Sequence, residues 1–303
     1  MSLISQVERI KEKITGKITF NESLAKLSWF NLGGPAKVLF RPKNLKELSF
    51  FLKRLSGEIN KIKIIGAGSN TLIRDGGFDG VIIKFGKSFS HISLLKSDTI
   101  IAGASVTDKN VSNFALENSL SGFEFLSCIP GVIGGGVRMN SGCYGEDISN
   151  ILVSVQAMDY LGNIKVIHAS DIKFSYRGSN LNNDLIFISA TFKGKKDIKL
   201  NIQKKINNFL KEKEKTQPLK VKTCGSTFKN PENNKAWKLI QDSGCAGMKV
   251  GDAQISDKHC NFFVNNRNAR SKDIEKLIYQ VKDKVFKNTG INLELEIQII
   301  GKN

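Results

Sequence analysis

The sequence predicts an α+β fold, because three stretches of the chain combine strands and helices in different ways. The N-terminal stretch alternates short strands with helices, and the middle stretch contains several strands separated by turns. Two long amphipathic helices and a closing strand occupy the last stretch. With 303 residues, the chain is long enough for about two domains.

Local patterns predict the individual elements. Short apolar runs bounded by turn residues predict strands at 36–41, 61–65, 81–84, 152–159, 164–168 and 185–192. Apolar residues at helical spacing predict helices at 45–52, 107–118, 198–210 and 274–285. Ser271 is the expected N-cap of the last helix. The chain closes on an expected strand at 293–301, which places Glu294, Glu296 and Gln298 on one side and leucine and isoleucine on the other.

Composition limits the classes of protein. The formal net charge of +18 would attract nucleic acid or any anionic small molecule, but no nucleic-acid-binding motif accompanies it. The five cysteines contain no C-x-x-C pair, so we expect no metal site and a reducing compartment, the cytoplasm. The longest apolar stretch, 123–137, contains Glu124 and Pro130, so we expect no membrane insertion.

A glycine-rich loop, Gly66-Ala67-Gly68-Ser69-Asn70, follows an expected strand. Glycines let backbone amides wrap an anion, and Ser69 and Asn70 add side-chain donors. A Rossmann fingerprint would need a glycine where Thr71 stands. The loop is therefore either an unusual anion cradle or an ordinary turn.

A second glycine-rich segment, IPGVIGGG at 129–136, is too dense in glycine for a stable ordinary helix interior. Asn140 and Gly142 follow it closely. Two such cradles in one chain suit a ligand that carries a diphosphate and a neighbouring ring. The alternative is close packing of two backbones.

Three further residues are candidates for chemistry. Ser226 lies in the segment CGSTFKNP, between Gly225 and an aromatic residue. Arg177 lies in SYRGS, and arginine favours bidentate recognition of carboxylates and phosphates. Glu296 lies on the closing strand. Taken singly, each is more often a structural residue than a catalytic one.

The order of these segments carries more information than any one of them. The segments follow one another along the chain in this order: FNLGGPA (30–36), GAGSNTLIRDGGFDGVII (66–83), IPGVIGGGVRMNSGCYG (129–145), YRGS, GSTFKNP, VGDAQISDKHCNFFVN (250–265) and LELEIQIIG. Together they resemble the UDP-N-acetylenolpyruvoylglucosamine reductase (MurB) family over residues 28–301. The length is similar to the shorter form of that family. Cys143 stands where the family more usually has a small residue such as alanine, and Asn261 stands where the resemblance leads us to expect glycine.

The resemblance implies a fold and a domain organisation. It implies an FAD-binding two-domain unit of the PCMH/vanillyl-alcohol-oxidase type plus a smaller α+β substrate-binding domain. The FAD-binding subdomains would be 1–86 and 87–197, and the substrate domain 198–296. The closing strand, about 297–303, would return to the first subdomain.

The resemblance also implies a reaction. FAD, bound non-covalently, would be reduced by NADPH and would pass hydride from N5 to C3 of UDP-N-acetylglucosamine enolpyruvate. The product would be UDP-N-acetylmuramate, a peptidoglycan precursor needed for cell-wall biogenesis, cell shape and cell division. Ser226 would protonate C2, Arg177 and Glu296 would stabilise the enolate, and Asn230 would contact substrate.

The family's flavin-binding residues fall in the two glycine-rich segments. They would be Gly66, Gly68, Ser69, Asn70, Gly131, Gly134, Gly135, Asn140 and Gly142. We expect a monomer that binds no nucleic acid. Two other classes stay open: a flavin oxidase of the vanillyl-alcohol type, which often tethers flavin covalently, and a non-catalytic nucleic-acid-binding protein. The visible absorption spectrum of the purified protein is the most informative observation, because a nucleic-acid-binding protein would lack flavin absorbance. Acid-precipitated protein that stays yellow would indicate the oxidase.

Overall fold

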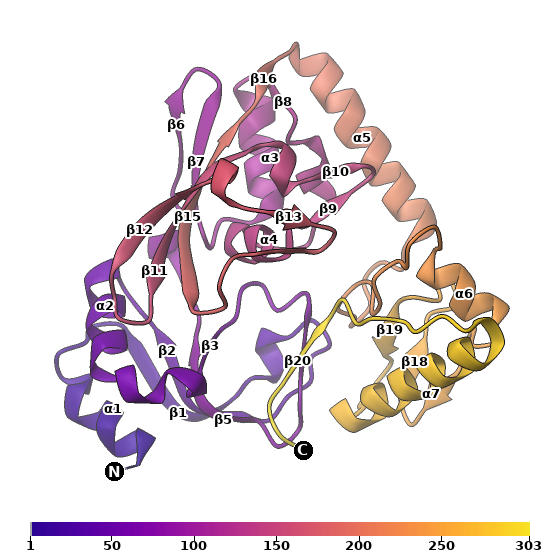
Figure 1. The fold of residues 1–303 in the computed structure, drawn as a ribbon, viewed down its shortest axis with the longest axis horizontal. Helices are drawn as coiled ribbons and strands as arrows, with labels where there is room; N and C mark the ends of the chain where they lie inside the picture. Colours follow the sequence, from indigo (N-terminus) through magenta and orange to yellow (C-terminus); the bar gives the residue numbers. More distant parts are fainter. Residues whose placement is uncertain (1) are drawn as a thin grey trace. The chain divides into compact units, whose positions relative to one another are not determined.

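The structure, a computed structural model, describes residues 2–303 (Figure 1). Contacts between Cα atoms divide the chain into two compact units. Unit 1 contains residues 2–20, Val38–Gly66 and Gly80–Lys213. Unit 2 contains Asn21–Lys37, Ala67–Asp79 and Glu214–Asn303. The expected domain boundaries after residues 86, 197 and 296 stay a prediction.

Helices and strands occur in both units. The helices are α1 (Leu3–Lys11), α2 (Leu45–Arg54), α3 (Asp108–Glu117), α4 (Ile133–Met139), α5 (Lys199–Thr216), α6 (Ala236–Asp242) and α7 (Ser271–Thr289). A four-stranded sheet has the order β1 (Lys17–Ser23), β2 (Pro35–Arg41), β5 (Phe78–Ile83) and β3 (Ile62–Ile64). A five-stranded sheet has the order β12 (Ile164–His168), β11 (Leu152–Asp159), β15 (Leu185–Lys193), β7 (Thr99–Gly103) and β6 (Ile92–Lys96).

The remaining strands are short. A three-stranded sheet has the order β17 (Lys249–Val250), β18 (Ala253–Ile255) and β19 (Phe263–Asn265). The paired strands are β8 (Leu120–Ser121) with β16 (Lys195–Lys196), β9 (Gly142–Cys143) with β10 (Glu146–Asp147), β13 (Phe174–Ser175) with β14 (Gly178–Ser179), and β4 (Thr71–Ile73) with β20 (Gln298–Ile300). The strands expected at 152–159 and 164–168 and the helices expected at 45–52 and 107–118 are all present.

The five-stranded sheet of unit 1 is covered on both faces. On one face, side chains such as Ala157 and Phe187 pack with residues of α3 and α4 in one core. On the other face, Met158, Ile186 and Ile188 pack with the apolar sides of α1 and α2. Neighbouring residues of one strand point to opposite faces, so β11 and β15 contribute to both cores.

The glycine-rich segment contains a helix, although its glycine content predicts none. Residues 133–139 form α4 although Gly134, Gly135 and Gly136 are inside it. Two of its residues, Ile133 and Val137, are buried in the unit 1 core. Helical stability in proteins comes mainly from such packing and less from propensity. The prediction that this segment avoids helix was therefore wrong.

Unit 2 is built around α7 and the three-stranded sheet. Buried α7 residues pack with apolar residues of β18 and β19 and with Phe30 and Leu72. The C-terminal strand β20 pairs in parallel with β4, with Ile299 opposite Leu72. This strand is shorter than the expected 293–301, although Leu293 and Ile297 are buried as the alternation predicts.

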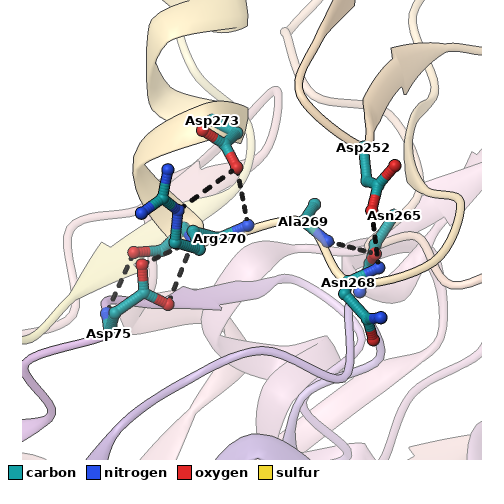
Figure 2. A network of polar contacts seen from close by, with 8 residues as sticks. Asp75, Asp252, Asn265, Asn268, Ala269, Arg270 and Asp273 are labelled. Carbon is teal, nitrogen blue, oxygen red and sulfur yellow. Dashed lines mark hydrogen bonds and ion pairs between the residues drawn. The ribbon is translucent and has the colours of Figure 1, made fainter.

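The N-terminus of α7 is capped by a distant segment. Arg270, and not the expected Ser271, occupies the N-cap position. Ser271 is the first helical residue, and its N–H donates to the carboxylate of Asp75 at 2.9 and 3.1 Å (Figure 2). The hydroxyl of Ser271 in turn accepts from the Asp75 N–H at 2.9 Å. A local sequence signal could not reveal a capping partner that comes from elsewhere in the chain.

Among residues 2–303, none of the helices combines the length and the apolar character needed to cross a membrane.

Candidate active site

The two glycine-rich segments meet within unit 1. A Cβ atom on Gly66 would lie 2.9 Å from a methyl group of Val132, so the first loop begins against the second segment. The second segment is held by main-chain hydrogen bonds from Ile133 N–H to the Val106 carbonyl and from Gly134 N–H to the Ala104 carbonyl, both 2.9 Å. The segments that the sequence pairs as ligand cradles are therefore neighbours.

The glycines of the second segment differ in their surroundings. A side chain on Gly131 would collide with the carboxylate of Asp108, and one on Gly134 would press on Ala104 at 3.1 Å. A Cβ atom on Gly135 would meet nothing within 4 Å. Packing explains Gly131 and Gly134, as the alternative interpretation proposed. Packing does not explain Gly135, which stands open to a bound group.

A half-buried cation, Lys84, lies at the start of the first loop. The ammonium of Lys84 donates a hydrogen bond to the carbonyl of Gly66. Burial lowers the pKa of Lys84, and the nearby charge of Arg41 lowers it further. A bound anion would relieve the repulsion between these two cations. The start of the loop is therefore electrostatically suited to a diphosphate.

The rest of the first loop belongs to unit 2. Gly68 has φ of +73°, and the Leu27 carbonyl occupies the space that a side chain would need. Its own carbonyl accepts from the Trp29 N–H at 3.0 Å. Ser69 is half-buried. The side-chain amide of Asn70 donates to the Glu296 carbonyl at 3.0 Å, which joins the loop to the closing strand segment.

The Ser226 segment is held by a closed set of hydrogen bonds within unit 2. The Thr227 N–H donates to the Asn261 carbonyl at 2.8 Å. The Phe228 N–H donates to Asn261 Oδ1 at 2.9 Å, and the Phe228 carbonyl accepts from Asn261 Nδ2 at 2.8 Å. We call this arrangement the Asn261 clamp. It fixes the backbone immediately after Ser226, while the half-buried serine follows the open, left-handed Gly225.

Glu296 is attached to the same segment. Its N–H donates to the Thr227 carbonyl at 2.9 Å, and its carbonyl accepts from Asn70. The structure therefore brings Ser226, Glu296 and Asn70 into one hydrogen-bonded region of unit 2. Asn230 lies nearby in sequence, but its Oδ1 accepts from the Ala236 N–H at 3.0 Å and so caps the start of α6.

Arg177 and the end of the second segment lie in unit 1. Arg177 Nη2 donates to the Gly142 carbonyl at 2.8 Å, and its guanidinium lies 4.9 Å from the Tyr176 ring centre. Arg177 has φ of +56°, which is uncommon for a bulky residue and is a feature that clusters at functional sites. Asn140 ends α4 in a left-handed conformation, and its side-chain amide donates to Asp147 and Ser175.

Three residues of the site region were not predicted as site residues. Asn261 forms its clamp with a segment far away in sequence, which no local pattern indicates. Lys84 is one of many lysines, and only its burial distinguishes it. Asp108 occupies the first turn of α3, where an acidic residue is ordinary, yet it is completely buried beneath Gly131 and Gly136.

Residues 2–303 contain no cluster of three or more histidine, cysteine or acidic side chains that could hold a metal ion.

Comparisons with known proteins agree with this geometry. The FAD binding domain family matches residues 36–170, which include both glycine-rich segments. Fold and site thus define a flavin-dependent oxidoreductase. The C-terminal domain of UDP-N-acetylenolpyruvoylglucosamine reductase matches residues 217–300, which include the Ser226 segment and Glu296. The chain belongs to the UDP-N-acetylenolpyruvoylglucosamine reductase (MurB) family.

Relatives match over nearly the whole chain. A UDP-N-acetylenolpyruvoylglucosamine reductase from Pelagibacter ubique (strain HTCC1062) is 53% identical over 300 residues, covering 98% of this chain and 99% of the relative. One from Orientia tsutsugamushi (strain Boryong) is 44% identical and covers 96% of both chains. The crystal structure of the Thermus caldophilus enzyme (MurB) superposes with a TM-score of 0.81 at 29% identity, covering 94% of this chain and 99% of that chain. The predicted family, fold class and FAD cofactor are confirmed.

The buried Asp108 leads to a prediction about stability and pH. Burial raises the pKa of Asp108 to about 8, from an ordinary value of 3.8. Between these values the folded protein holds a proton that the unfolded chain releases, so the free energy of unfolding falls as pH rises from about 4 to about 8. The slope from this residue is at most about 1.4 kcal/mol per pH unit. Asp108→Asn keeps the shape without the ionisable group and should remove that slope.

Urea denaturation of wild type and Asp108→Asn across this pH range measures the difference. Asp171→Asn, at an exposed position in the same unit, is the control and should keep the wild-type profile. Parallel profiles for wild type and Asp108→Asn would contradict the prediction.

Proposed function

We propose that this protein reduces the enolpyruvyl ether of UDP-N-acetylglucosamine to the lactyl ether of UDP-N-acetylmuramate, with electrons from NADPH. The observation that carries the proposal is the hydrogen bond between the Glu296 N–H and the Thr227 carbonyl. It joins the Ser226 segment to Glu296 in a chain whose family reduces such a substrate by name. The product would serve peptidoglycan synthesis in the cytoplasm, and through it cell shape and division.

The residues of the glycine-rich segments fit FAD. Gly66 and the half-buried Lys84 suit the diphosphate, and the open position at Gly135 leaves room for a close approach to the flavin. When bound, FAD supplies the hydride from N5 to C3 of the enolpyruvyl group. We propose that Gly66, Gly68, Ser69, Asn70, Gly131, Gly134, Gly135, Asn140 and Gly142 form its binding segments. Gly68 and Asn140 also bond other parts of the protein, which fixes the shape of these segments.

Ser226 donates the proton to C2. Hydride addition to C3 leaves negative charge on C2 and on the adjoining carboxylate, and this enolate is basic enough to take a proton from a hydroxyl. Clamping of Thr227 and Phe228 by Asn261 supports the role, because general acid catalysis requires a fixed donor. The open left-handed Gly225 lets substrate approach the hydroxyl closely.

Arg177 and Glu296 stabilise the enolate. The Arg177 guanidinium neutralises charge that builds on the substrate carboxylate, and the hydrogen bond to Gly142 fixes its direction. Glu296 shares this role from the closing segment, which its N–H joins to the Ser226 segment. Asn230 contacts substrate. Its hydrogen bond to the Ala236 N–H at the start of α6 fixes the segment in which it lies. The net charge of +18 favours capture of the UDP-linked substrate and of NADPH, which are both anionic.

A substitution at Gly135 tests the flavin cradle. A Cβ atom at Gly135 meets no other atom within 4 Å, and leucine raises helix propensity in α4, so Gly135→Leu should fold. The leucine should block the flavin, so the variant should purify without the flavin absorbance that wild type carries. Gly57→Leu, which also meets nothing within 4 Å in unit 1, is the matched control and should keep its flavin. A folded Gly135→Leu variant with full flavin occupancy would overturn the assignment.

Replacement of Ser226 tests the proton donor. Ser226→Ala should bind FAD and be reduced by NADPH at the wild-type rate, since neither step uses the hydroxyl. Stopped-flow reoxidation of the reduced protein by the enolpyruvyl substrate should slow by about 10²–10⁴, as for loss of a general acid. Ser226→Cys keeps an acidic proton and should recover part of the rate.

The control is Ser243→Ala, which removes a buried hydroxyl elsewhere in unit 2 and should reoxidise normally. Reoxidation of Ser226→Ala near the wild-type rate would rule out the donor role. Denaturation tests whether FAD is bound non-covalently. The flavin absorbance should then leave the precipitated chain and remain in solution.

A further inference from the structure

Two cysteines with no role in the proposed reaction are neighbours in unit 1. Cys128 ends the short 3-10 helix η4 (Glu124–Cys128), and Cys143 lies on β9. The Cys143 thiol donates to the carbonyl of Phe125 in η4 at 3.3 Å, and it also interacts with the Cys128 thiol at the end of the same short helix. Both cysteines are reduced. The two thiols therefore lie on neighbouring elements, within reach of each other.

The surroundings make one member of the pair the nucleophile. The hydrogen bond from Cys143 lowers the pKa of Cys128 to about 7 against the opposing effect of burial, and Ser127 and the charge of Lys213 lower it further. The same hydrogen bond, with burial, raises the pKa of Cys143. A thiolate at Cys128 beside a thiol at Cys143 is the arrangement of an attacking and a resolving cysteine.

We propose that Cys128 and Cys143 are a redox-active pair that a hydroperoxide converts reversibly into a disulfide. The Cys128 thiolate attacks one oxygen of hydrogen peroxide, the O–O bond breaks, and the departing hydroxide takes a proton and leaves as water. Cys128 is then a sulfenic acid. The Cys143 sulfur attacks the Cys128 sulfur, the S–O bond breaks, and the released hydroxide takes the Cys143 proton. Two thiols and one peroxide thus give one disulfide and two waters.

The position of the pair gives the disulfide a consequence, which rests on the proposed function. Cys143 is the last residue of β9, and Tyr144 and Gly145, both with positive φ, form the tight turn to β10. The neighbouring Gly142 offers its carbonyl to Arg177. A disulfide brings the sulfur atoms to about 2.05 Å, closer than any hydrogen-bonded pair of thiols. Oxidation therefore draws β9 toward η4 and displaces the anchor of Arg177.

The pair can be tested on the FAD-bearing protein with hydrogen peroxide as the oxidant. Wild type should lose two of its five thiols and the mass of two hydrogen atoms, and peptide mapping should join Cys128 to Cys143. Dithiothreitol should reverse both changes. Cys143→Ala removes the resolving thiol and should form no disulfide. Cys260→Ala, a buried cysteine in unit 2, is the matched control and should behave as wild type.

Formation of the disulfide is read from mass and thiols, so its failure is separate from any failure of the proposed reaction. Unchanged thiols in wild type after peroxide treatment, or a disulfide between other cysteines, would overturn the pair. The consequence is read by stopped flow. Oxidised wild type should be reoxidised by the enolpyruvyl substrate at least about tenfold more slowly, as expected when a positioning contact is displaced. An unchanged rate in disulfide-bonded protein would overturn the effect on Arg177.

Discussion

The Asn261 clamp is the interaction on which the rest of unit 2 depends. One buried side-chain amide satisfies both main-chain polar groups of Phe228, and the Asn261 carbonyl accepts from Thr227. Buried polar groups are costly when left unpaired, so this set of bonds permits only one path for the chain after Ser226. The Thr227 carbonyl accepts a hydrogen bond from the Glu296 N–H, so the same path also sets the position of the closing segment.

In unit 1, the glycine-rich segment brings main chain close to neighbouring parts of the protein. Packing of Ile133 and Val137 lets three successive glycines remain in a helix that their propensities disfavour. Gly131 and Gly134 then let this helix approach its neighbours, and Gly135 stays open. The buried carboxyl of Asp108 lies beneath this helix without a hydrogen-bond partner among residues 2–303. A buried carboxyl group without a hydrogen-bond partner lowers the stability of the folded protein.

Local patterns predicted much of the fold, and the order of motifs predicted the family. Strands at 152–159 and 164–168 and the helix capped by Thr107 follow from residues close in sequence, so they could be foreseen. The helix α4 could not, because tertiary packing overrides the low propensity of glycine. The cap on α7 by Asp75 and the clamp by Asn261 join distant segments, and single-sequence patterns do not contain such pairings. The proposed roles of Ser226, Arg177 and Glu296 rest on the motif match together with these contacts.

The rate at which the enolpyruvyl substrate reoxidises the reduced flavin in Asn261→Ala is the most direct test of the clamp. The substitution leaves Ser226 itself and the FAD-binding segments of unit 1 unchanged. We expect folded, FAD-bearing Asn261→Ala to be reduced by NADPH as wild type is, and to be reoxidised about 10- to 100-fold more slowly, because a misplaced catalytic group loses rate on that scale. Reoxidation at the wild-type rate would contradict the account, since Ser226 would then need no clamp to do its work.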